Sequence, residues 1–207
     1  MKDCNMTKPP VLTNEILRIQ CLHDLQILDT PEEEEYTNIV LVASSVCSTP
    51  IAAISLLDTS RQWFKAKTGI TEKQTNRDIS FCGHAVAYEN KFFQVEDTLE
   101  DNRFSENPMV VSGNKIRFYA GVQLFSRMGY KLGMLCVNDT KPNVLTDGQM
   151  FTLQVLADAV SKLIELRFIH KQSEEKSRKI ESHARTEEML LHMMAHDSQL
   201  YHDNRGK

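Results

Sequence analysis

The chain has 207 residues, of which 41% are hydrophobic and 25% are charged, and its formal net charge is −4 at pH 7. This length accommodates one domain of about 150 residues and an extension. The small negative charge excludes the broad basic surface of a nucleic-acid-binding protein, and no segment reaches the ~18 to 20 apolar residues of a membrane span. Scattered cysteines without a CxxC pair, and an N-terminus without an apolar export run, favour a location in the reducing cytoplasm.

Two helices are expected in the first quarter of the chain, after a flexible lead-in at residues 1–12. The first helix would be capped by Thr13 or Asn14, with apolar residues at three- and four-residue steps: Ile16, Leu17, Cys21, Leu25 and Leu28. The second would be capped by Thr30, with Glu33 completing a capping box. Its apolar face would carry Tyr36, Ile39, Val40, Ala43, Val46 and Cys47.

The pattern then changes to that of strands in an antiparallel sheet. Residues 51–57 are almost continuously apolar and residues 62–67 alternate, which predicts a hairpin. A short strand is expected at 92–95, and a second hairpin is expected from 117–124 and 131–138. Strands followed by helices in this order predict an α+β fold.

Residues 77–86 gather more chemically capable side chains than any other stretch. Ser80 is a preferred N-cap residue, so a helix is expected to begin after it, with Cys82 and His84 near its start. The free N–H groups and partial positive charge of a helix start favour a bound anion or a thiolate at Cys82. Each residue taken singly is better explained as part of a packed core.

A small-molecule pocket is expected between the sheet and segment 77–104, because polar and aromatic residues concentrate in these loops. A charged loop, 96–108, would act as a lid. The expected ligand-binding residues are Trp63, Arg77, Asp78, Phe81, Cys82, His84, Phe104, Arg117 and Tyr119. No metal site is expected, because Cys82 and His84 supply only two of the roughly four ligands of a closed zinc site.

The last quarter of the chain has a long helical pattern. Thr146 and Gln149 form a capping box, and the segment 171–188 is almost entirely polar. An isolated helix this polar is expected either to fray or to pair with a second copy. We therefore expect a transmitter helix at 169–195 that forms a parallel coiled coil in a homodimer, followed by a disordered tail at 196–207. A solvated single helix is the alternative.

The motifs of residues 17–167 resemble those of a GAF domain, in the bacterial subgroup that serves as sensory input to histidine kinases and diguanylate cyclases. The resemblance is carried by segments 27–33, 54–58, 61–66, 77–82, 117–121, 132–137 and 145–146. It implies a six-stranded antiparallel sheet flanked by helices, with a long C-terminal helix, and a GAF domain at 13–168.

The resemblance also implies a sensory module that is not itself an enzyme, and that signals to a histidine kinase or diguanylate cyclase partner. The signal would be an unidentified small molecule or a redox change, and no cofactor is identified. Bilin-binding relatives have a Cys followed directly by His, whereas Gly83 separates Cys82 from His84 here. The alternative function is a thiol-dependent reductase of methionine sulfoxide or peroxide, with Cys82 as the catalytic thiol and His84 lowering its pKa.

The segment 197–205 keeps the Asp, Asn and Arg of a motif that resembles the opening motif of diguanylate cyclases, but lacks its Leu-Thr-Gly-Leu core. Three matches in nine positions are explained better by chance than by ancestry. Their place after a transmitter helix keeps open a second interpretation, in which this is a sensor severed from its output domain.

Overall fold

The computed structural model describes the backbone of residues 7–203 and the side chains of residues 7–189. It divides into two units, Met1–Glu165 and Leu166–Lys207. Within the described part of the chain, no helix combines the length and the apolar character that a membrane span requires.

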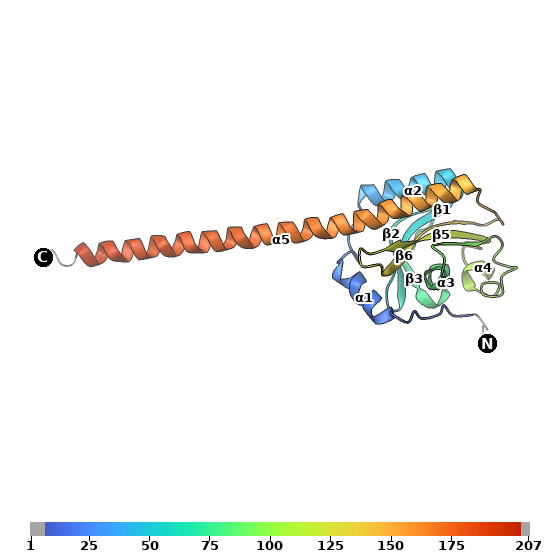
Figure 1. Ribbon diagram of the computed structural model, residues 1–207, viewed down its shortest axis with the longest axis horizontal. Helices are drawn as coiled ribbons and strands as arrows, with labels where there is room; N and C mark the ends of the chain where they lie inside the picture. Colours follow the sequence, from blue (N-terminus) through green and yellow to red (C-terminus); the bar gives the residue numbers. More distant parts are fainter. Residues whose placement is uncertain (1–6, 204–207) are drawn as a thin grey trace. The chain divides into compact units, whose positions relative to one another are not determined.

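The first unit is built on a six-stranded antiparallel sheet with the order β3-β2-β1-β6-β5-β4 (Figure 1). The two predicted hairpins and the short strand are confirmed within one residue at each end, because apolar runs bounded by turn residues define them. The strands are β1 Ile51–Leu57, β2 Arg61–Thr68, β3 Gln74–Asn76, β4 Phe92–Val95, β5 Phe118–Phe125 and β6 Lys131–Asp139. Strand β3, at residues 74–76, is not among the predicted strands, and it pairs with β2 at the edge of the sheet.

Strand β2 does not alternate strictly as the sequence suggests. Ala66 pairs with Ile54 of β1 and Phe64 pairs with Ser55, so Lys65 is the extra residue of a β-bulge. Directly paired residues share a face of an antiparallel sheet. The bulge therefore changes which residues of β2 face each side.

One face of the sheet is covered by two helices that run side by side in Figure 1, α2 Glu34–Cys47 and the first part of α5 Asp147–Asp203. The buried residues of these helices are aliphatic, small or aromatic: Tyr36, Val40, Ala43, Cys47, Leu153, Ala157, Val160 and Ile164. The predicted capping box that opens α5 is confirmed, since the Thr146 amide donates to Gln149 and the Gln149 amide donates to Thr146.

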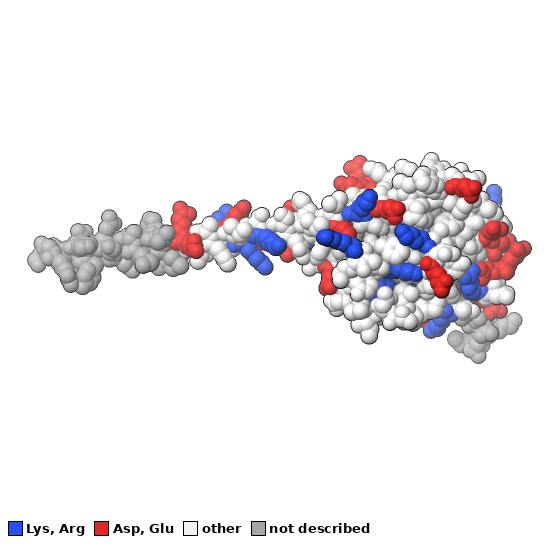
Figure 2. All heavy atoms as spheres, viewed as in Figure 1, with Lys and Arg blue, Asp and Glu red and all other residues white. Residues whose placement is uncertain are grey.

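The opposite face is covered by shorter elements, η1 Arg77–Ile79, α3 Phe81–Ala87 and α4 Pro108–Val111. Helix α3 begins after Ser80 as predicted, because the Ser80 hydroxyl accepts a hydrogen bond from the Gly83 amide at 3.0 Å. On the face of the molecule in Figure 2, basic and acidic side chains are interspersed rather than gathered in one basic patch.

Two predictions for the N-terminal helices are wrong. Helix α1 Glu15–Asp24 buries Arg18 and Leu22, whereas Ile16 and Leu17 are exposed. Arg18 is buried because its guanidinium is bound by Glu15 and by the Lys131 carbonyl, a pairing that hydrophobic periodicity does not detect.

The predicted capping box at Thr30 and Glu33 does not form either. Helix α2 begins at Glu34, and the Thr30 hydroxyl donates to the Ile27 carbonyl instead. The Glu33 carboxylate pairs with Lys65, so a contact with the sheet replaces the local cap.

Helix α5 continues to Asp203, beyond the expected end near residue 194. In the tail that was expected to be disordered at 196–207, the described backbone is helical as far as Asp203. The segment 197–205, with its likeness to a cyclase motif, falls outside the residues whose side chains are described. From Glu174 to Met189 the described side chains are exposed.

Candidate functional site

A cavity of about 270 Å³ lies against the sheet face that carries α3 and α4. Its floor is formed by β1, β2, β5 and β6, and its walls by η1, the start of α3, and the loops before β3 and after α4. Most of its lining is apolar and aromatic, including Phe64, Ile79, Phe81, Met109 and Ile116. Such a lining with a few polar groups is typical of small-molecule sites.

Strand pairing decides which residues reach this cavity. Gln62 and Phe64 line it, whereas Trp63, the residue between them, lies on the opposite side of β2 and borders a surface hollow with Pro31. Trp63 therefore does not contribute to the cavity, contrary to expectation. The sequence analysis selected Trp63, the largest side chain of the strand, and missed its two neighbours, Gln62 and Phe64, which line the cavity.

An aromatic cluster fills the space beside the cavity. Phe81 is stacked with Tyr119, at 5.4 Å between ring centroids, and both residues line the cavity. Phe104 contacts the other side of Phe81, at 4.7 Å, and is completely buried. Phe104 therefore belongs to the core behind the cavity wall and does not cover the cavity as a lid residue.

His84 is the next residue of this cluster and does not line the cavity. Its ring lies edge-on to Phe104, and its Nε2 is 3.1 Å from the Thr7 carbonyl. Burial lowers the pKa of His84, with an opposing contribution from the Thr7 carbonyl. A neutral imidazole in this position holds the N-terminal segment on α3.

Cys82 lies in the cavity wall with a second thiol beside it. Its Sγ is 3.8 Å from the Sγ of Cys136 and accepts a hydrogen bond from the Tyr119 hydroxyl at 3.2 Å. Burial alone would raise the pKa of Cys82, but the hydrogen bonds from Cys136 and Tyr119 outweigh it and the pKa is lowered. The pKa of Cys136 is raised well above its usual value by its bond to Cys82 and by burial.

The groups that lower the pKa of the Cys82 thiol are thus Cys136, Ser55 and Tyr119, and His84 is not among them. Among the described residues, no hydrogen bond joins Cys82 to His84, which instead holds Thr7. The catalytic pair of the reductase alternative is therefore not assembled.

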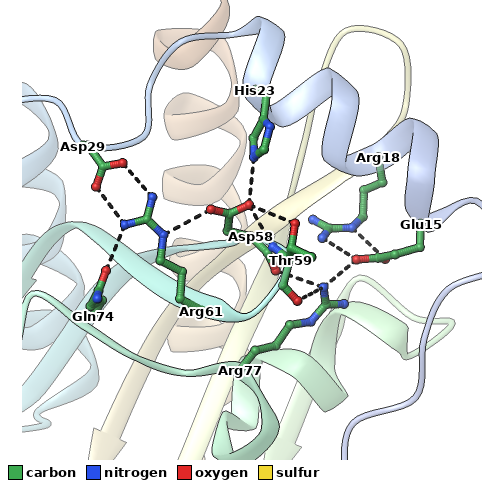
Figure 3. Close-up of polar contacts among 9 residues, drawn as sticks. All are labelled: Glu15, Arg18, His23, Asp29, Asp58, Thr59, Arg61, Gln74 and Arg77. Atoms are coloured by element: carbon green, nitrogen blue, oxygen red, sulfur yellow. Dashed lines mark hydrogen bonds and ion pairs between the residues drawn. The ribbon is translucent and has the colours of Figure 1, made fainter.

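The charged residues expected at the site are engaged elsewhere. Arg77 binds Glu15 of α1 and the Asp58 carbonyl (Figure 3). Asp78 pairs with Lys8, and Arg117 pairs with Asp97. None of the three lines the cavity. Of the nine expected residues, the structure brings Phe81, Cys82 and Tyr119 together in its wall.

Arg77 belongs to a larger polar network between α1, the β1–β2 turn and β3 (Figure 3). Arg61 binds both carboxylate oxygens of Asp29, one oxygen of Asp58 and the Gln74 side chain. Asp58 also contacts His23 at 2.8 Å. These contacts fix the ends of the strands that form the cavity floor.

Many solved structures match this fold, among them two GAF domains that are 16% and 12% identical to this chain. The GAF domain of the Acinetobacter phosphoenolpyruvate-protein phosphotransferase has a TM-score of 0.55, with 75% of this chain and 98% of that chain covered. The PixJ GAF domain of Thermosynechococcus elongatus has a TM-score of 0.57, with 81% and 96% covered. The chain has a GAF fold. No protein-family model matches the sequence.

A curated relative of this GAF domain is the cyclic di-GMP phosphodiesterase PA2567 of Pseudomonas aeruginosa. The two sequences are 41% identical over 137 residues, which is 66% of this chain and 23% of the relative. The chain therefore spans about a quarter of the length of that protein. The expectation that this chain is not an enzyme is contradicted by this match, because the similar protein is named as a phosphodiesterase.

Sequence reasoning missed several residues that shape the cavity of this GAF domain. Gln62, Glu72, Thr75 and Asn114 line it, together with the second thiol, Cys136. Gln62 could have been found, because it precedes Phe64 by two positions on a predicted strand. Glu72 and Asn114 come from loops whose path has no signature in the sequence. Within the described residues, no group of three His, Cys, Asp or Glu side chains is placed to hold a metal ion.

Proposed function

We propose that residues 13–168 form a sensory GAF domain, whose cavity binds a small molecule and thereby controls the breakdown of cyclic di-GMP by a phosphodiesterase. The observation that carries this proposal is the apolar cavity, whose lining residues Gln62 and Thr75 each have a buried oxygen atom without a hydrogen-bond partner among the described residues. A domain that served only as a scaffold would gain stability by filling this space. The relative named a cyclic di-GMP phosphodiesterase supports the choice of reaction.

The polar helix at 169–195 is proposed to carry the signal as a parallel coiled coil in a homodimer. Ile169 and Ile180 are exposed apolar residues, and their spacing of 11 positions places them on one side of an otherwise charged helix. Pairing would cover them, and the polar middle would keep the association weak enough to change with the state of the cavity. Sedimentation of the full chain against a chain ending at residue 167 tests this. A dimer only in the full chain supports it, and monomers in both cases reject it.

The sensory role is tested by replacing the matching segment of the Pseudomonas phosphodiesterase with that of this chain. A Met109→Trp substitution in the replacement fills the cavity from its half-buried rim. The matched control is Met128→Trp in the exposed β5–β6 turn, which does not line the cavity. We expect Met109→Trp to change the turnover of cyclic di-GMP several-fold and Met128→Trp to leave it unchanged. Equal turnover in both variants, with both folded, contradicts the proposal.

A second candidate signal is oxidation, favoured by the contact between Cys82 and Cys136. A hydroperoxide would accept two electrons from the Cys82 thiolate, its O–O bond would break, and Cys82 would become a sulfenic acid. The Cys136 thiol would then attack that sulfur, with loss of water, to form a disulfide. The bond would join α3 to β6 across the cavity wall.

Treatment with hydroperoxide and peptide mapping test this second candidate. We expect a peptide that links Cys82 to Cys136 and a mass decrease of about 2 Da. Cys47 is the internal control, because burial raises its pKa to about 11 and it should stay reduced. Alkylation of Cys82 no faster than that of Cys47, with no linked peptide, excludes the redox signal and leaves ligand binding as the function of the cavity.

A further inference from the structure

The size of the cavity limits what can enter it. A dry protein cavity of about 150 Å³ holds benzene, and ligand pockets in general start near ~300 Å³. At about 270 Å³, this cavity has room for a one- or two-ring molecule. Cyclic di-GMP contains two guanines, two riboses and two phosphates and is larger than such a molecule, so it does not fit as the bound signal.

The charge of the cavity excludes anions. Among its lining residues there is no Lys, Arg or His, and the charged member is Glu72, which is exposed at the rim. Lys67 is on the same face of the sheet, but its Nζ donates to the Ile70 and Thr71 carbonyls and it does not line the cavity. A buried phosphate or carboxylate would therefore lose its hydration without gaining a cationic partner.

Two oxygen atoms in the wall show which group the ligand must carry. Gln62 Oε1 and Thr75 Oγ1 are both buried and have no hydrogen-bond partner within the described residues. The two residues are directly paired between β2 and β3, so their side chains are cross-strand neighbours. Gln62 is 5% exposed. An amide oxygen can only accept, so its partner must donate a hydrogen.

We infer that the cavity binds a small uncharged or cationic ring compound, whose N–H or O–H group donates to Gln62 and Thr75. The apolar body of the ligand would lie among Phe64, Phe81 and Ile116, next to the aromatic cluster, and a cationic substituent would face Glu72 at the rim. This inference rests on the proposed sensory role of the cavity, and it specifies the class of ligand.

The experiment measures binding of four matched probes to the full chain by calorimetry: indole, 1-methylindole, tryptamine and indole-3-acetate. Indole and 1-methylindole have the same ring system, but the second lacks the N–H donor. We expect indole and tryptamine to bind with dissociation constants below 1 mM. 1-Methylindole and indole-3-acetate should bind at least about tenfold more weakly, because one lacks the donor and the other is an anion.

Two variants test whether Gln62 and Thr75 accept the hydrogen bond from the ligand. In Gln62→Met, the preference for indole over 1-methylindole should decrease, because one of the two acceptors is replaced by an apolar group of similar length. Thr75→Val, which keeps the shape of the side chain, should reduce the preference for indole and serves if Gln62→Met does not fold. Circular dichroism at the assay temperature establishes that each variant is folded.

Three outcomes would overturn the inference. These are a preference for indole that persists in both variants, equal binding of indole-3-acetate and indole, and no binding of any probe at 1 mM. The last outcome would mean that ordered water occupies the two oxygens. Each can be separated from a failure of the proposed function, because probe binding is measured on this chain, whereas the function is measured as turnover of cyclic di-GMP.

Discussion

The two faces of the sheet are built from the same strands but bury different chemistry. Toward α2 and α5, strand β1 presents Ile54 and Leu56, which pack in an aliphatic layer that is closed to solvent. On the side toward α3, the same strand presents Ala53, the residue before Ile54. Ala53 lines the cavity together with Cys136, its partner on β6. Successive side chains of a strand point to opposite faces of the sheet. The same strand therefore contributes to a packed layer that stabilises the domain and to a cavity that can bind a small molecule.

The comparison shows where the domain can tolerate an empty space. The helix-covered face has long elements that cross several strands, whereas the cavity face is covered by η1, α3 and α4, none longer than seven residues. Short elements and the loops between them leave gaps that one long helix would close. Substitutions on the two faces should therefore differ in how much they lower the free energy of unfolding.

The largest expected effect comes from one substitution made on each face. Ile54→Ala, toward α2, should lower the free energy of unfolding by about 3 kcal/mol, because it opens a new cavity in a filled layer. Ile70→Ala, in the cavity wall, should cost about 1 kcal/mol, because its half-buried side chain already borders open space. Urea denaturation of both variants measures the difference. Equal losses would mean that the two faces are equally well packed.

A smaller effect is expected for the buried lysine on the helix-covered face. Lys65 Nζ donates to Glu33, to the Pro31 carbonyl at 2.7 Å and to Thr30. Lys65→Met should lower the free energy of unfolding by about 2 kcal/mol, because these acceptors lose a buried cationic donor.

The matched control for this prediction is Lys67→Met, two positions further along β2. Lys67 is half-buried and donates to two carbonyl groups at the surface of the domain. Its substitution should cost less than about 0.5 kcal/mol. If Lys67→Met lowered the free energy of unfolding as much as Lys65→Met, the buried ammonium group of Lys65 would have no special role.

The smallest expected effect concerns Asp58, in the turn that joins β1 to β2. Burial alone would raise the pKa of Asp58, but hydrogen bonds from His23, the Thr59 amide and Arg61 lower it to about 2. Because the folded pKa is below the unfolded value of ~4, this stabilisation is complete above pH 5 and is lost as the pH falls toward 2.

Asp58→Asn should therefore remove about 1 kcal/mol of unfolding free energy at pH 7 and little at pH 2. Denaturation curves at several pH values measure this. The exposed Asp24→Asn, which removes one negative charge outside this network, is the control and should change the free energy of unfolding at pH 7 by less than about 0.5 kcal/mol. A loss that is the same at pH 7 and pH 2 would contradict the role assigned to the Asp58 carboxylate.

The sequence predicted the strands and the helix start at Ser80 because these depend on local signals. Apolar runs, turn residues and an N-cap serine act within a few positions of one another. The bulge at Lys65, the burial of Arg18 and the short strand β3 depend on partners from 9 to 113 positions away. Periodicity contains no information about such partners.

The site was predictable in part for the same reason. Phe81, Cys82 and Tyr119 were predicted correctly as residues of the cavity wall. The first two lie in segment 77–86, and the third lies in the second predicted hairpin. Arg77 and Arg117 were misplaced because a charged residue in a motif can as well serve an ion pair as a ligand, and here each has a carboxylate partner. Gln62 and Thr75 became visible only when their pairing placed two unsatisfied oxygens together.

The order of the strands also bears on how copies of this protein can associate. The two edges of the sheet are its shortest strands, β3 with 3 residues and β4 with 4, whereas the four inner strands have 7 to 9. A short edge offers few free backbone groups to a strand from another chain. The topology itself thus disfavours edge-to-edge aggregation of copies that meet at high local concentration.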